Sequence, residues 1–263
     1  RKLKERVALE HSLRGAMQAG HLSVHYQPIL DVRTRRVVAL EALVRWKHPK
    51  SGFVPPSKFI PVAEETGLIV PIGEFVLERV IRDACAWRAD GATLAPIAVN
   101  VSAAQLARPD LPKTVARLAR QYDFPPQLLQ VELTESAMIG GTEARGGEGH
   151  ADVVEELRAL GLRLAIDDFG TGYSSLGYLK RWRVDAIKID RSFVRDLVTD
   201  SSDYAIVGAI VAMARHLHVD VVAEGVEGWP QLDVLRRLGC HHAQGYLFAE
   251  PQPADQVRRF LHG

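Results

Sequence analysis

Eight short apolar runs, rich in Val, Ile, Leu and Ala, recur along the chain, and each carries a polar residue within it or directly after it. A strand buried on both faces of a sheet should be apolar throughout, so a polar residue at its end is costly unless it meets a partner or a metal. Most of these runs alternate with segments of helical periodicity, which is typical of parallel βα units. The polar residues are Gln27, Glu41, Asn100, Glu132, Asp167 with Asp168, Lys188, Glu224 and Gln244.

This alternation predicts an α/β fold, a (β/α)8 barrel of the TIM type whose strands deliver their polar residues to one rim. The first two strands, near 23–30 and 36–45, are joined by a link of only five residues. Such a link cannot hold a crossover helix, so this pair should be antiparallel and the barrel irregular at its start. Helices are expected near 57–66, 72–90, 110–122, 151–160, 203–217, 229–238 and 253–261.

Length and charge fit one large domain and exclude several partners. The 263 residues, 47% hydrophobic, are enough to enclose a full barrel. With 33 basic and 32 acidic residues the net charge is +1, so no overall field attracts a nucleic acid polymer or an anionic membrane. Cys85 and Cys240 fit no metal-finger spacing and are expected to be thiols in a reducing cytoplasm.

Residues 1–20 carry apolar side chains on a helical period that ends at Gly20. A basic amphipathic helix can bind a membrane surface, but a connector from an upstream domain is the preferred interpretation. The chain starts at Arg1 without a Met, which favours the same view. We therefore expect a linker helix at 1–20 and one domain at 21–263, in the cytoplasm, with any membrane anchor lying further upstream.

Five of the strand-end residues are acidic and would share one rim. So many carboxylates can converge only if cations sit among them, which indicates a metal-dependent enzyme. A salt bridge or a helix cap would explain any one acid alone. That explanation is weak for Asp167 and Asp168, which are adjacent at a strand end, precede a glycine-containing turn and have no basic residue nearby in sequence.

Several motifs together resemble one known family. Glu41-Ala42-Leu43, followed by Arg45-Trp46, is similar to the signature of EAL domains, the bacterial phosphodiesterases of cyclic di-GMP. The similarity runs from about Leu22 to the C-terminus, and each block alone would be a weak signal. The other blocks are Tyr26-Gln27-Pro28-Ile29, Asn100-Val101-Ser102, Glu132-Leu133-Thr134-Glu135-Ser136, Asp167-Asp168-Phe169-Gly170-Thr171-Gly172-Tyr173, Lys188-Ile189-Asp190-Arg191-Ser192-Phe193, Glu224-Gly225-Val226-Glu227 and Gln244-Gly245-Tyr246.

The resemblance implies hydrolysis of cyclic di-GMP to linear pGpG with two Mg²⁺ or Mn²⁺ ions. All of the implied ligands offer hard oxygen atoms, which suit these ions. Asp167 would bridge the two ions, as in other two-metal sites that cleave phosphodiesters. The implied ligands are Glu41, Asn100, Glu132 and Asp167 for the first ion, and Asp168 and Glu224 with Asp167 for the second.

The same resemblance assigns catalytic and binding roles. Lys188 would hold or polarise the attacking water, with Glu224 and Glu41 also catalytic; an ion pair of Lys188 with Asp190 or Glu132 is the structural alternative. The residues expected to bind substrate are Gln27, Leu43, Arg45, Asp190 and Gln244. Glu135 and Glu227 are expected to anchor the loop after Asp168, which contains Thr171, Tyr173 and Ser174 and is thought in this family to reach a homodimer interface.

One segment departs from the family. Residues Gly140–Gly149 are glycine-rich and longer than is usual there, so we expect a mobile loop and leave regulation open. The main alternative function is a non-catalytic cyclic di-GMP receptor, but such members typically lose a carboxylate or the Lys that this chain retains. The arginines of Arg33-Thr34-Arg35-Arg36 are interpreted as solvated hairpin residues.

Overall fold

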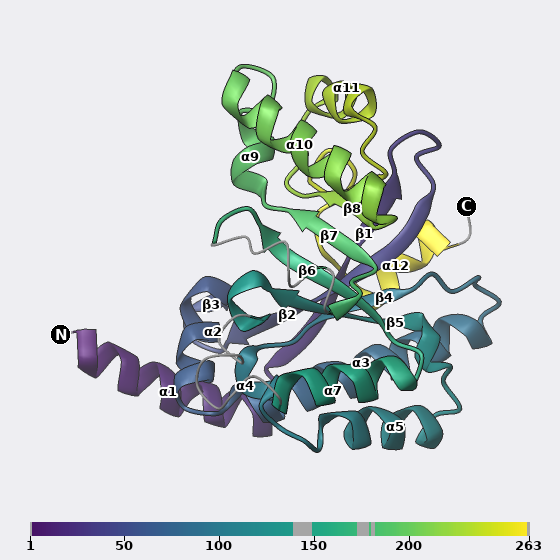
Figure 1. Ribbon diagram of the computed structural model, residues 1–263. Coiled ribbons are helices and arrows are strands. Elements are labelled where there is room, and N and C mark those ends of the chain that lie inside the picture. Colours follow the sequence, from purple (N-terminus) through teal and green to yellow (C-terminus); the bar gives the residue numbers. More distant parts are fainter. Residues whose placement is uncertain (1, 139–148, 173–178, 180–181, 262–263) are drawn as a thin grey trace.

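The computed structural model describes residues 2–138, 149–172, 179 and 182–261 (Figure 1). Eight strands form a closed barrel in the order β1-β9-β8-β7-β6-β5-β4-β2, and β2 returns to pair with β1. The predicted barrel is therefore confirmed. The barrel strands are β1 (Leu22–Asp31), β2 (Val37–His48), β4 (Ile97–Asn100), β5 (Leu129–Thr134), β6 (Arg163–Phe169), β7 (Ala186–Ile189), β8 (Asp220–Ala223) and β9 (His242–Ala243).

The irregular start is also as predicted. β1 runs antiparallel to β2, with Gln27 opposite Glu41, and it is antiparallel to β9 as well. The remaining neighbours, from β2 through β4 to β9, pair in parallel. Two short strands that the sequence did not predict extend this region, β3 (Gly52–Val54) against β2 and β10 (Gln252–Pro253) against β1.

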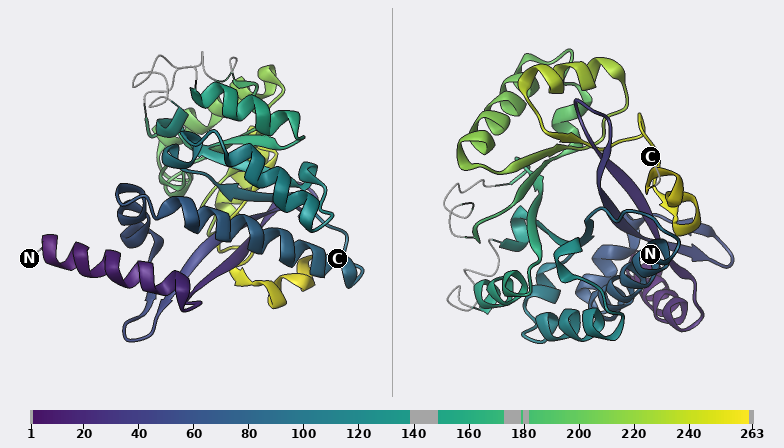
Figure 2. Two further views of the ribbon diagram at one scale, coloured as in Figure 1. Left: turned by 90° about the horizontal axis from the view of Figure 1, so that it is seen from below. Right: turned by 90° about the vertical axis from the view of Figure 1, so that its right-hand side faces the viewer.

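Helices cover the outside of the barrel, as both views of Figure 2 show. The seven predicted helices agree with the structure to within three residues at each end, while the short helices α4, α9 and η1 were not predicted. Helix ends follow local chemistry: Asp200 accepts backbone N–H bonds at the start of α10, and Gly239 ends α11 in a left-handed conformation. The helices are α1 (Lys2–Gln18), α2 (Pro56–Glu65), α3 (Ile69–Ala89), α4 (Ala103–Leu106), α5 (Leu111–Gln121), the 3-10 helix η1 (Pro126–Leu128), α7 (Gly149–Ala159), α9 (Arg191–Arg195), α10 (Ser201–Leu217), α11 (Trp229–Leu238) and α12 (Ala254–Leu261).

The N-terminal helix α1 is part of the domain's packing. Leu13 and Ala16 are buried in the same hydrophobic core as the barrel strands, and α1 lies against α2. Its free end projects away from the barrel (Figure 1). Among the described residues, no helix is long and apolar enough to cross a membrane. Cys85 and Cys240 are free thiols, and Cys240 is buried.

Candidate active site

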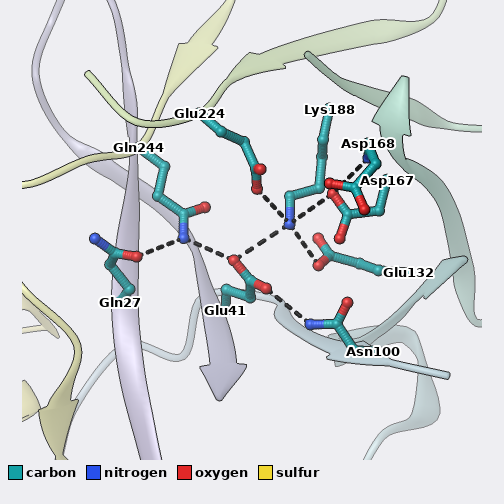
Figure 3. A network of polar contacts seen from close by, with 9 residues as sticks. All are labelled: Gln27, Glu41, Asn100, Glu132, Asp167, Asp168, Lys188, Glu224 and Gln244. Carbon is teal, nitrogen blue, oxygen red and sulfur yellow. Dashed lines mark hydrogen bonds and ion pairs between the residues drawn. The ribbon is translucent and has the colours of Figure 1, made fainter. Parts of the chain in front are cut away.

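Nine of the predicted polar residues meet in one network inside the barrel mouth (Figure 3). Seven of them come from six of the eight barrel strands, and Glu224 and Gln244 come directly after the other two, β8 and β9. The parallel strands contribute them at or just beyond their carboxyl ends, where side chains of neighbouring strands converge. The nine are Gln27, Glu41, Asn100, Glu132, Asp167, Asp168, Lys188, Glu224 and Gln244.

Lys188 lies at the centre of this network and is fully buried. Its ammonium nitrogen is 2.7 Å from a carboxylate oxygen of Glu132 and 2.7 Å from one of Glu224. Glu41 follows at 3.2 Å and Asp167 at 3.4 Å. The sequence offered an ion pair with Glu132 as the alternative for Lys188. The structure shows that pair together with three others, so Lys188 is the hub of the cluster.

The carboxylates form two groups that share Asp167. Glu41, Glu132 and Asp167 each place an oxygen within 4.8 Å of the others, and so do Asp167, Asp168 and Glu224. The two groups contain the carboxylates of the two ligand sets that the family resemblance implied, and the ligand roles stay a prediction. Asn100 lies beside the first set and donates from its amide nitrogen to Glu41 at 2.8 Å.

A break in β6 explains how two consecutive aspartates reach one site. Neighbouring residues in a regular strand point to opposite faces. The pairing of β6 with β7 shifts register between Ile166 and Phe169, and Asp168 has a φ of 53°, in the left-handed region. This irregularity turns both carboxylates toward the site, at the cost of backbone strain that often marks functional positions.

The electrostatics of the cluster are unbalanced. Burial opposes the charge on Lys188, but the surrounding carboxylates outweigh it and hold the pKa of Lys188 well above its usual value. Burial also raises the pKa of Glu132 well above normal and, against the attraction of Lys188, raises the pKa of Glu224 to about 8. Glu41 keeps a lowered pKa despite its burial, because Lys188, Gln244 and Asn100 stabilise its charge.

One lysine does not neutralise five carboxylates, so the described chain leaves this cluster with excess negative charge. One oxygen of Glu132 is buried and has no hydrogen-bond partner among the described residues, which is costly for a carboxylate. Divalent cations held by oxygen ligands would neutralise the excess negative charge and give the unpaired oxygen of Glu132 a partner. The residues present therefore fit a pair of such ions.

Gln244 connects the cluster to β1. Its amide nitrogen donates to Glu41 at 2.7 Å and to Gln27 at 2.8 Å. Gln27 in turn donates to the carbonyl of Ala249 at 2.9 Å. Gln244 therefore helps to fix the position of Glu41, and Gln27 in turn holds Gln244 (Figure 3).

A cleft of about 420 Å³ opens above the cluster. Leu43 and Arg45, which were expected to bind substrate, line it, and among the described residues Arg45 donates only to the backbone carbonyl of Val44. Arg191, Tyr246 and Pro251 also line it and were not singled out as site residues from the sequence. Tyr246 and Arg191 belong to motif blocks that were recognised in the sequence, so these blocks could have identified them as site residues.

A second, more apolar cavity of about 500 Å³ adjoins the cleft between the barrel and helices α2 and α3. The two cavities share Leu43, Arg45 and Asn100. The site can therefore receive an elongated ligand that extends to both sides of the carboxylates.

The remaining predicted residues lie around the site. Asp190 caps α9, where its carboxylate accepts from the backbone and hydroxyl of Ser192. Glu135 is buried, with its carboxylate close to Gly172, and Glu227 lines the cleft. Thr171 is described, but Tyr173, Ser174 and residues 140–148 of the glycine-rich segment lie outside the described residues.

Two curated bacterial proteins are similar to this chain over nearly its whole length. The MucR protein of Pseudomonas aeruginosa, a bifunctional diguanylate cyclase/cyclic di-GMP phosphodiesterase, is 44% identical over 254 residues, covering 97% of this chain and 36% of MucR. The cyclic di-GMP phosphodiesterase NbdA of the same organism is 42% identical over 257 residues, covering 98% of this chain and 32% of NbdA. The chain thus spans about a third of the length of these relatives.

Among solved structures, the PaMucR phosphodiesterase in complex with c-di-GMP superposes with a TM-score of 0.88 at 44% identity, covering 95% of this chain and 99% of that one. The family model of the EAL domain matches residues 10–251. On these matches, and as its motifs predicted, the chain belongs to the EAL domain family.

Proposed function

We propose that this domain is a metal-dependent phosphodiesterase that hydrolyses cyclic di-GMP to linear pGpG. The observation that carries the proposal is the pair of carboxylate groups that share Asp167 around the buried Lys188. The names of MucR and NbdA include this activity, and the solved MucR structure contains c-di-GMP. Glu41, Asp167, Asp168, Lys188 and Glu224 are all present in this chain.

Glu41, Asn100, Glu132 and Asp167 would hold one ion, and Asp167, Asp168 and Glu224 the other. A pair of Mg²⁺ or Mn²⁺ ions would activate a water and stabilise charge on the phosphoryl group. Lys188 keeps its proton among the carboxylates and would orient the water and offset developing negative charge. Glu224, with a pKa near 8 in the ion-free cluster, would lose its proton when it becomes a ligand.

The cleft supplies groups for binding a cyclic dinucleotide. Arg45 and Arg191 line it without a carboxylate partner among the described residues, so their guanidinium groups are available for phosphate oxygens. Leu43 would contribute its backbone and side chain to the same wall. The two adjoining cavities offer room for the two guanines, with Gln27, Asp190 and Gln244 as polar groups beside them.

The direct test is incubation of the purified chain with cyclic di-GMP and Mg²⁺ or Mn²⁺, with the products separated by chromatography. We expect pGpG that disappears when a chelator is added. Glu41→Gln should abolish turnover, whereas Glu155→Gln, on the exposed face of α7, should leave it unchanged. Tight binding without product in either metal would overturn the enzyme and favour the receptor function.

Ca²⁺ provides a second test of the two-ion site. Its larger and more flexible coordination shell should support binding of cyclic di-GMP while misplacing the water. Little hydrolysis is therefore expected in Ca²⁺ alone, and rapid hydrolysis there would count against the assignment.

We also propose that the domain works as the phosphodiesterase module of a longer cytoplasmic signalling protein and forms a homodimer through the barrel. The span of about a third of the length of MucR and NbdA supports the first point, and α1 would then connect the domain to an upstream region. Light scattering of the purified chain would test the dimer.

A further inference from the structure

A surface hollow of about 710 Å³ lies away from the catalytic cleft and is lined by Arg33, Arg35, Trp229 and Arg236. The sequence places these residues nearly 200 positions apart. The structure brings the β1–β2 hairpin against α11, as the right-hand view of Figure 2 shows. Arg236 ties the two elements together by donating to the carbonyl of Val32 at 3.2 Å.

The hairpin presents its arginines in a fixed arrangement. The Asp31 carboxylate accepts from the backbone of Arg33 and Thr34 and from the Thr34 hydroxyl, so it is engaged in the turn. Arg35 has a φ of 59°, a conformation uncommon for a residue with a side chain. Its guanidinium carbon lies 5.9 Å from the centre of the Trp229 ring, within cation–π range.

Most of the positive charge here has no carboxylate counterpart in the part of the chain that the structure describes. Arg33 and Arg35 make no ion pair with a carboxylate among the described residues. Arg236 has only the exposed Asp233, at 3.2 Å. Trp229 is 53% exposed, whereas Trp46, Trp87 and Trp182 are all buried. The exposed indole and the guanidinium groups without carboxylate partners lie side by side. A ligand that is both anionic and aromatic would stabilise both.

We propose that this hollow is an effector site for a purine nucleotide with two or more phosphates. The guanidinium groups match phosphate oxygens in charge and in geometry. The indole offers a face on which a base can stack. The net charge of +1 and the small extent of the cluster argue against a nucleic acid polymer. An acidic peptide would satisfy the arginines but leave the indole unused.

The hollow is linked to the catalytic site through the start of α11. Trp229 follows Glu224 by five residues. The Gln231 side chain accepts from the backbone N–H of Glu227 and Gly228 and donates to carbonyls of Val194 and Arg195 on α9. A nucleotide that holds Trp229 therefore also restrains the segment 224–228, which begins with the proposed metal ligand.

Titration of the metal-free protein with ATP or GTP, followed by tryptophan fluorescence, tests the site. In chelator the catalytic carboxylates hold no cations and repel the nucleotide. The titration then measures binding at the hollow and not at the catalytic cleft. Because the other three tryptophans are buried, quenching should be saturable and should vanish in Trp229→Phe. Arg35→Ala and Arg33→Ala should each weaken binding by about tenfold, while Arg117→Ala on the exposed face of α5 should not.

Absence of saturable quenching at millimolar nucleotide would overturn the proposal, as would unchanged affinity in the Arg33→Ala, Arg35→Ala double variant. Hydrogen exchange gives a readout that does not depend on catalysis. Nucleotide should slow exchange at the amides of 224–228 in the wild-type protein and leave it unchanged in the double variant. Unchanged exchange in the wild type would overturn the effector role.

Discussion

Two buried acidic sites in this barrel differ in how their charge is balanced. On the outer side of β1, Asp83 of α3 accepts hydrogen bonds from the Tyr26 hydroxyl at 2.7 Å and from Arg79 at 3.0 Å. One carboxylate there meets one guanidinium and one neutral donor. Inside the barrel, Lys188 contacts four of the five clustered carboxylates, and a buried oxygen of Glu132 has no partner among the described residues.

The two sites are separated by a single step along the chain. Tyr26 and Gln27 are adjacent on β1, and successive residues of a strand point to opposite faces, so one reaches Asp83 and the other reaches Gln244 and the catalytic network. The difference teaches that burial of an acid is not by itself a sign of function. A buried acid whose charge and hydrogen bonds are satisfied by the chain's own groups indicates a structural role. A group of buried acids with too little positive charge around it indicates a site for cations.

Asp167→Asn should break the catalytic cluster most severely. Asp167 is the carboxylate common to both ligand groups, so its loss weakens both ion positions, and we expect turnover to fall by about a thousandfold or more. Stability in chelator should not fall, because one of several mutually repelling charges is removed. Steady-state hydrolysis and urea unfolding would measure the two effects. A variant that kept a tenth of the wild-type rate would contradict the bridging role.

Lys188→Met should have the largest effect on folding. It removes the cation that four carboxylates contact, and loss of one partner from a buried ion pair typically costs about 3–5 kcal/mol. We expect a loss of this size in chelator and a smaller one in saturating Mg²⁺, whose charge replaces that of the lysine. Urea unfolding in both conditions would measure it, and equal losses with and without Mg²⁺ would argue against a cation site.

The sequence predicted the barrel and its antiparallel start, and the polar residues it singled out at the strand ends meet in one network, because each strand end has a local signature. It did not predict how Asp167 and Asp168 face the same site, since the register shift in β6 depends on pairing with β7. The hollow beside Trp229 was also missed. The arginines of the β1–β2 hairpin were interpreted as solvated because only tertiary packing brings Arg236 and Trp229 to them.

Asp83→Asn tests the buried acidic site on the outer side of β1, which we interpret as structural. The substitution removes the charge that Arg79 contacts while keeping the side-chain shape, so we expect a loss of about 1–3 kcal/mol in the free energy of unfolding. Turnover of cyclic di-GMP should be unchanged, because Asp83 lies outside the cleft. Tyr26→Phe, which removes only the hydroxyl bond to the same carboxylate, should cost less. A large loss of turnover in folded Asp83→Asn protein would remove the distinction between the two sites.

The smallest expected effect is a pH dependence of stability to which the raised pKa values in the carboxylate cluster contribute. Burial raises the pKa of Glu224 from an ordinary value of 4.5 to about 8, and the pKa values of Glu132 and Asp168 are also raised. Between these values the folded state holds a proton that the unfolded chain has released, so stability should fall as the pH rises from about 4.5 to 8. One such proton contributes a slope of at most about 1.4 kcal/mol per pH unit.

Saturating Mg²⁺ should flatten this slope, because a cation takes the place of the proton among the carboxylates. Urea unfolding of the wild-type protein across this pH range, with chelator and with Mg²⁺, would measure both slopes. Glu224→Gln removes one of the titrating groups and should reduce the slope in chelator without added metal. Stability that rose with pH in chelator would mean that the cluster is already neutralised by its own lysine, and the contrast with Asp83 would be lost.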